Sequence, residues 1–159
     1  MTDAKFEDGA DGPLRLIAGD PEGVTVLSAL LQDAVFPITE MTYAVKRRRF
    51  ALLLNRFRWE DRDAAEAARR RYERVQSLLV FEDVLSVKTT GLDRKDKDMI
   101  LSLLAVTFTP GEDGTGRVDL LLAGDGTIAL QVEVLDASLR DVSRPYVAPS
   151  GRVPTHEEE

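Results

Sequence analysis

The residues best suited to chemistry in this chain are the arginines of one segment. Residues 46–74 hold eleven Lys and Arg against five Asp and Glu, a local net charge of +6, whereas the other 130 residues carry −13. Ten of the eleven cations are arginine, whose planar guanidinium binds phosphate or carboxylate through paired hydrogen bonds. Phe57, Trp59 and Tyr72 lie among them, as in surfaces that hold a nucleic-acid backbone and stack its bases. The segment is therefore the candidate binding surface.

The acid-rich remainder of the chain offers a competing explanation. The overall net charge is −7, whereas dedicated nucleic-acid-binding domains are usually basic as a whole. The arginines would then solvate a strand end and a helix face while they pair with acids of the same chain. We favour this internal neutralisation, followed by a groove for an acidic partner or a phosphorylated small molecule.

Composition and spacing argue against several kinds of site. The chain has no cysteine, and its one histidine is His156, so we expect no thiol nucleophile, no cysteine-ligated metal and no Ser-His-Asp triad. The loop 93–98 places carboxylates at its first, fourth and sixth positions, not at the first, third and fifth positions of a calcium loop. The glycine-rich loop 111–116 precedes an expected strand, whereas a phosphate-binding loop precedes a helix.

Catalysis by carboxylates alone is the remaining route to an enzyme. The notable acidic pairs are Glu60–Asp61 and Glu82–Asp83. Adjacent residues on a strand point to opposite faces, so neither pair shares a site by its spacing. We therefore predict no catalytic residue, no metal site and no cofactor. Enzyme activity stays open at this point, with a non-enzymatic role favoured.

Sequence patterns predict helices at three places. Asp20, as a side-chain cap before Pro21, begins an amphipathic helix that Pro37 ends. A second helix runs from Asp61 or Asp63 to about Gln76. A short closing helix covers residues 135–142.

The patterns in the rest of the ordered chain predict strands. They are expected at residues 14–17, on both sides of a basic turn at 46–49, and at 78–81, 84–87, 100–108, 118–122 and 127–134. Asp125-Gly126 predicts a hairpin between the last two of these strands, because both residues tolerate a positive φ. After the buried first half of 50–59, Arg56 and Arg58 alternate with Phe57 and Trp59, which predicts a half-exposed strand end.

These elements favour an α+β fold. We expect one mainly antiparallel sheet of six to eight strands with two or three helices on one side. Residues 50–57 and 101–108 share three identities in eight positions, so a split sheet of two helix–strand–strand repeats is an alternative. We expect a single domain at residues 13–142, a flexible N-terminal tail at 1–12 and an extended C-terminal tail at 143–159.

The most distinctive stretch of the sequence is 48–60, which reads RRFALLLNRFRWE. With it, residues 14–18, 30–35, 81–87 and 101–105 give the chain, over about residues 14–142, a resemblance to a bacterial family known as domain of unknown function 2948. The resemblance implies a cytoplasmic bacterial protein and supplies no catalytic residues. It directs attention to the polar residues at the end of the 48–60 stretch.

We predict a cytoplasmic, non-enzymatic binding or partner-interaction domain that uses an arginine-rich surface. The candidate binding residues are Asn55, Arg56, Arg58, Trp59, Glu60, Arg70 and Arg74. The expected partner is a protein or an anionic ligand, nucleic acid is a less favoured alternative, and a carboxylate-dependent enzyme is the second alternative. No apolar run approaches the roughly 20 residues of a membrane span, so we expect no membrane partner. A monomer and a homodimer both stay open.

Overall fold

The computed structural model of the chain describes residues 12–147 and 153–154. Residues 1–11 of the tail predicted at 1–12 and much of the tail predicted at 143–159 lie outside these residues. The structure has the following elements in order: β1 (Arg15–Ala18), α2 (Pro21–Leu31), β2 (Val35–Pro37), η1 (Ile38–Glu40), β3 (Met41–Ala44), η2 (Val45–Arg47), β4 (Arg49–Phe57), η3 (Trp59–Asp61), α3 (Arg62–Ala67), β5 (Glu73–Phe81), β6 (Val84–Thr90), β7 (Ile100–Pro110), η4 (Glu112–Gly114), β8 (Gly116–Leu122), β9 (Thr127–Val132), β10 (Ala137–Asp141) and β11 (Tyr146–Val147). Within the described part of the chain, no helix is both long and apolar enough to cross a membrane.

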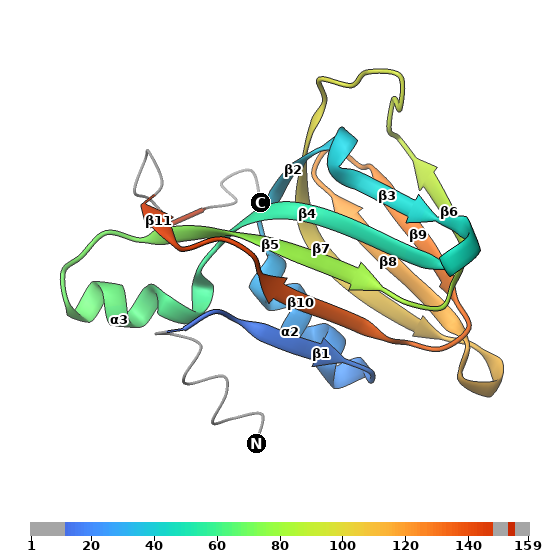
Figure 1. Cartoon of the computed structure of the whole chain (residues 1–159), viewed down its shortest axis with the longest axis horizontal. Coiled ribbons are helices and arrows are strands. Elements are labelled where there is room, and N and C mark those ends of the chain that lie inside the picture. The colour runs from blue at the N-terminus through green and yellow to red at the C-terminus, as the bar shows by residue number, and fades with distance from the viewer. Residues whose placement is uncertain (1–11, 148–152, 155–159) are drawn as a thin grey trace.

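The strands form one antiparallel sheet in the order β1-β10-β5-β4-β2-β7-β8-β9-β6, with β3 beside β4 and β11 beside β5. The short strand β2 joins its two halves, because Val35 pairs with Asn55 of β4 on one side and with Ser102 of β7 on the other. Figure 1 shows β4, β5 and β10 in front, with α2 and the strands β7, β8 and β9 behind them. The sheet therefore bends at β2 so that its halves face each other.

One continuous core lies between the two halves. Its buried side chains include Leu52 and Leu79 from the front half, Leu103 and Leu120 from the rear half, and Leu27 from α2. Along β4 buried and partly exposed residues alternate, as they do along β5, so each strand of the front half turns one face to this core.

The first helix begins where the sequence predicts. The Asp20 side chain accepts a hydrogen bond from Gly23 N–H at 2.7 Å, and Pro21 occupies the first helical turn. The helix ends at Leu31, well before Pro37, because Val35 already pairs in the sheet.

The second predicted helix is much shorter than expected. α3 ends at Ala67, and Arg69 then adopts a left-handed conformation with φ 55°. Arg70 N–H donates to Ala65 O at 3.0 Å, which is the closing bond of a Schellman motif. Arginine gives no sequence signal for this ending, whereas glycine would. Residues 73–81 instead pair with β4 along eight positions, so strand pairing overrides the helical spacing.

The third predicted helix is a strand. Residues Ala137–Asp141 form β10, which lies between β1 and β5. Ala137 and Leu139 are buried, whereas Ser138 and Arg140 point away from the core. The sequence shows only this brief alternation, and the spacing of Leu135, Leu139 and Val142 also fits a helix turn.

The described residues form eleven strands instead of the expected six to eight. The strands that sequence patterns did not predict are β2, which is three residues long and ends in Pro37, β10 and the two-residue β11. The Asp125-Gly126 hairpin is confirmed between β8 and β9, but the positive φ values fall at Gly124 and Asp125. The described residues do not form two equivalent helix–strand–strand repeats, because β4 pairs with the strand before it, β3, whereas β7 pairs with β2 and β8 and the strand before it, β6, pairs with β9.

Candidate functional site

The predicted site residue Arg56 lies in the interior at the end of β4. Its side chain is 0% exposed and forms a bidentate pair with Glu60, with Nη1 and Nη2 donating to the two carboxylate oxygens at 2.9 and 2.7 Å. Nη2 also donates to Asp141 of β10 at 3.0 Å, and Nε donates to Ser77 Oγ of β5 at 3.0 Å. Asp141 in turn accepts the backbone N–H of Leu14 at 2.8 Å. The guanidinium thus joins β4, β5, β10 and the start of β1.

A second set of ion pairs continues from this one. Arg58, 4% exposed, donates to Glu73 at 2.5 Å and lies 3.7 Å from Asp61. The buried Asp61 carboxylate accepts two hydrogen bonds from Arg70, at 2.7 and 2.6 Å. Arg58 Nε is also 3.9 Å from Glu60, which links the two sets. We call Arg56, Arg58, Glu60, Asp61, Arg70, Glu73 and Asp141 the buried ion network.

The buried ion network is close to electrically neutral. It contains three arginines and four carboxylates. Burial by itself would lower the pKa of Arg56, but the hydrogen bonds and charges of Glu60 and Asp141 outweigh burial and raise it above its ordinary value. Arg56 is therefore held as a fixed cation with its donors occupied, which suits a structural role.

Asn55 and Arg74 form a separate polar group on the outer side of the same two strands. Arg74 Nη2 donates to Asn55 O at 3.1 Å and its Nε to Asn55 Oδ1, while the Asn55 amide donates to Tyr146 Oη of β11. Arg74 Nη2 also lies 3.5 Å from Asp33 O. Burial lowers the pKa of Arg74, and the charges of Tyr146 and Asp33 oppose this change.

Trp59 packs against neighbouring rings and is half-buried. Its centroid lies 4.6 Å from that of Phe57, whose ring is 5.7 Å from Tyr72. Trp59 Nε1 donates to Gln32 O at 3.0 Å, and the Arg62 guanidinium lies 5.8 Å from the indole centroid. Phe57 is 1% exposed. These rings hold the end of β4 against the end of α2, and Phe57 cannot stack on a nucleotide.

The predicted arginine-rich surface is therefore not a surface at Arg56 and Arg58. Both guanidinium groups are buried and paired with carboxylates of the same chain, because the residues at the end of β4 meet Glu60, Asp61, Glu73 and Asp141 there. The basic segment is also divided. The basic turn at 46–49 and the cations after Phe57 lie at opposite ends of β4, about 26 Å apart at roughly 3.3 Å per residue. The half-exposed strand end expected from Arg56 and Arg58 is likewise wrong.

The carboxylates considered for catalysis do not meet in one cavity. Glu60 and Asp61 belong to the buried ion network, and Glu82 pairs with Arg49 at 3.0 Å near the other end of β4. No group of three or more acidic, His or Cys side chains among the described residues is arranged to hold a metal ion. These carboxylates therefore do not form the pair of one acid and one base that a carboxylate-dependent enzyme needs.

Sequence reasoning missed the outward face of the front strands. Strand register places its residues in rows: Ile17, Ser138, Val80 and Ala51 in one, Arg15, Arg140, Leu78 and Leu53 in the next, and Val142, Gln76 and Asn55 in the third. We call these eleven residues the outer face. Ile17 is 71% exposed and Val142 46%, while Leu53, Leu78 and Val80 are half-buried. No described helix covers it in Figure 1, where α2 lies behind the sheet.

The outer face is unusual for a solvated sheet. An antiparallel sheet with one free face normally alternates apolar residues inward with polar residues outward. Here apolar side chains occupy successive outward positions on β4 and β5, namely Ala51, Leu53, Leu78 and Val80. The alternation that would have identified this face is hidden in the continuously apolar runs Ala51–Leu54 and Leu78–Val80. Such runs predict a strand buried on both sides.

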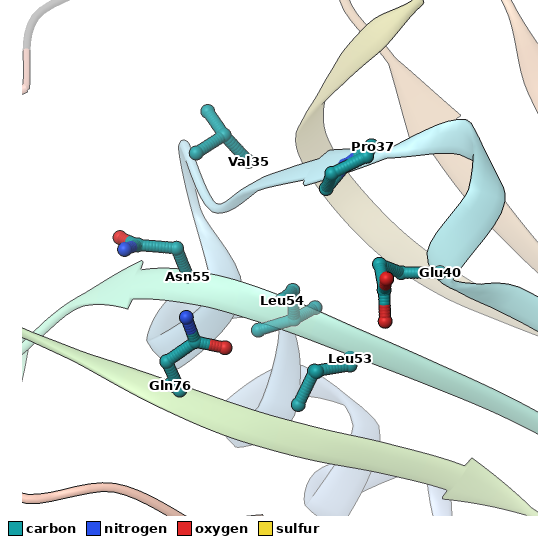
Figure 2. Close-up of a pocket in the computed structure, with 7 residues that line it drawn as sticks. All are labelled: Val35, Pro37, Glu40, Leu53, Leu54, Asn55 and Gln76. Carbon is teal, nitrogen blue, oxygen red and sulfur yellow. The ribbon is translucent and has the colours of Figure 1, made fainter. Parts of the chain in front are cut away.

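A small pocket opens beside the outer face. It has a volume of about 190 Å³ and is lined by Val35, Pro37, Glu40, Leu53, Leu54, Asn55 and Gln76. Figure 2 shows Asn55 and Gln76 on neighbouring strands, with Pro37 and Glu40 across from them. Pockets for drug-sized ligands usually measure about 300–1,000 Å³. This pocket is better matched to one side chain of a partner than to a whole substrate.

Comparison with known proteins gives one match. The model of the family described as Protein of unknown function (DUF2948) matches residues 14–156 of this chain. No curated protein and no solved structure matches it.

Proposed function

Because the chain belongs to the DUF2948 family, whose function is unknown, we propose from its structure that it is a non-enzymatic partner-binding domain. The proposed binding surface is the outer face, and not the buried arginines at the end of β4. The observation that carries this proposal is the set of adjacent apolar side chains that no described helix covers. Exposed apolar patches of this kind mark interaction sites in soluble proteins.

Three features of the outer face support binding to another protein. Its apolar centre, Leu53, Leu78 and Val80, lies on two strands paired along eight positions, so it is held rigidly. Arg15 lies on the edge strand and Arg140 lies beside Leu78, so both can supply charged contacts next to the apolar centre. The adjoining pocket can receive a single side chain from the partner.

The buried ion network has a supporting role in this proposal. It ties β4, β5 and β10 together at one end of the outer face through Arg56, Ser77 and Asp141. Strands fixed in this way keep the rows of outward side chains in register, so little conformational entropy is lost when a partner binds.

Site-specific photocrosslinking in cells that produce the protein tests the proposal. A benzophenone amino acid is placed at Val142 on the outer face and at Val134 in the β9–β10 connection, which have nearly equal exposures of 46% and 47%. A second pair compares Ile17 with Leu85 of β6. We expect discrete crosslinked species from Val142 and Ile17 and much weaker ones from the two controls. Equal crosslinking at all four positions, or none at the outer face, would contradict the proposed function.

A further inference from the structure

The strand β1 is an edge of the sheet whose pairing groups face outward. Among the described residues it pairs with β10 alone. Asp141 N–H donates to Leu14 O, so Leu14, Leu16 and Ala18 direct their backbone groups toward β10. Arg15 and Ile17 alternate with them and direct their N–H and C=O groups to the unpaired edge. The side chains of the same two residues lie on the outer face and are exposed.

The charges beside this edge are alike. Arg15 of β1 is directly opposite Arg140 of β10 in the strand register, and both side chains are exposed. Neither has an ion-pair partner in the part of the chain that the structure describes. Like charges directly opposite each other destabilise a strand pair, so an anion placed beside them relieves a repulsion as well as making an attraction.

We propose that β1 pairs with an extended segment of a partner protein, in which an acidic and an apolar residue are two positions apart. The added strand hydrogen-bonds to Arg15 and Ile17 and extends the sheet. Its acidic side chain lies beside Arg15 and continues the row of Arg15 and Arg140. Its apolar side chain lies beside Ile17 and continues the row that leads to Val80. This inference rests on the proposed function, because it names the chemistry of the partner for the same face.

A second copy of this chain fits the edge less well. Antiparallel pairing of two β1 strands about a two-fold axis brings both Arg15–Arg140 pairs to one short stretch of sheet. Four arginines would then lie in that stretch with no acid of β1 or β10 on the outer face to offset their charge. The charge of the edge therefore favours an acidic partner segment.

Binding of designed peptides to the full chain tests the proposal. The probe is a fluorescent peptide of repeated valine-threonine-glutamate-threonine, and the matched controls replace each glutamate by glutamine or by lysine. We expect the glutamate peptide to bind about fivefold to tenfold more tightly than the lysine peptide. The double variant Arg15→Glu, Arg140→Glu should reverse this order of affinity. Because both positions are exposed, circular dichroism should show that the variant is folded.

Hydrogen exchange identifies the edge that is used. The amides of Arg15 and Ile17 should gain protection when the glutamate peptide binds, while those of β6, the other end of the strand order, should not change. No binding, binding independent of charge, or protection confined to β6 would overturn the edge proposal. Crosslinking at Val142 and Ile17 without protection of β1 would overturn it and leave the proposed function standing. Protection of the β1 amides by a single-stranded oligonucleotide but not by the glutamate peptide would assign the edge to nucleic acid and also overturn the proposal.

Discussion

Arg56 and Glu60 form a bidentate ion pair that is removed almost completely from solvent, with side chains that are 0% and 1% exposed. The pair lies where β4 ends and η3 begins, four residues apart along the chain. A charge in such a place needs its partner, because the desolvation of each ion is offset only by the other ion and by hydrogen bonds.

Removing the charge of Glu60 should destabilise the fold strongly. In Glu60→Gln, Arg56 remains buried and, among the described residues, keeps Asp141 as the one carboxylate within hydrogen-bond distance. Breaking a buried pair on one side costs about 3 kcal/mol in the free energy of unfolding. Urea denaturation followed by circular dichroism measures this change.

The matched control for this loss is the pair Arg49–Glu82. Its side chains are 44% and 35% exposed. Glu82→Gln should lower the free energy of unfolding by less than about 1 kcal/mol, because solvent screens an exposed pair. Equal losses in the two variants would mean that the buried ion network is no more important than surface pairing.

Arg56→Lys should also destabilise the protein although it preserves the charge. Lysine has no planar fork, so one ammonium cannot meet both Glu60 oxygens, Asp141 and Ser77 in the positions that the guanidinium fills. We expect a loss of about 2 kcal/mol, as for a buried polar group left without a partner. Arg49→Lys at the exposed pair should change the free energy by less than about 0.5 kcal/mol. An Arg56→Lys variant with unchanged stability would show that a positive charge, without the bidentate geometry, is sufficient to stabilise the fold.

Local sequence signals predicted the elements that depend on local physics. The Asp20–Pro21 helix start needs only a side-chain oxygen and a fixed φ within one turn, and the hairpin between β8 and β9 needs a few residues that tolerate positive φ. Both are confirmed. The internal neutralisation favoured for the basic segment describes Arg56 and Arg58 well.

Elements that depend on distant residues were not predictable in this way. β10 forms because β1 and β5 lie on either side of it, and more than 50 residues separate it from each of them in the chain. The burial of Arg56 likewise depends on Asp141, which is 85 residues away in the sequence. A hydrophobic pattern reports which residues avoid water but not which charges will meet, so the outer face and the buried ion network needed the three-dimensional structure.

Loss of the Glu66 charge should lower the pKa of Tyr72. The Tyr72 hydroxyl donates to Glu66 Oε2 at 2.7 Å, and this hydrogen bond, with the nearby negative charge, raises the pKa above 10.0. The hydrogen bond favours the neutral phenol. Its contribution to the stability of the fold is therefore fully present below about pH 10 and is lost as the pH rises through the folded-state pKa. In Glu66→Gln, spectrophotometric titration of tyrosinate should show one tyrosine that ionises at lower pH than in the wild type. An unchanged titration curve would contradict the hydrogen bond.

Gly116 should not tolerate a side chain, because β7 and β8 approach closely there. A Cβ at this position would lie 2.5 Å from Phe108 Cε1 and 2.8 Å from Thr109 O. The ring packs against the core and the carbonyl belongs to the paired strand, so neither can move without loss of packing. Gly116→Ala should therefore lower the free energy of unfolding by about 1–3 kcal/mol in urea denaturation. At Gly19 a Cβ would meet only Leu135 O at 3.7 Å, an ordinary contact, so Gly19→Ala should change the free energy by less than about 0.5 kcal/mol. Equal stabilities of the two variants would show that β7 and β8 are packed less tightly at Gly116 than their register requires.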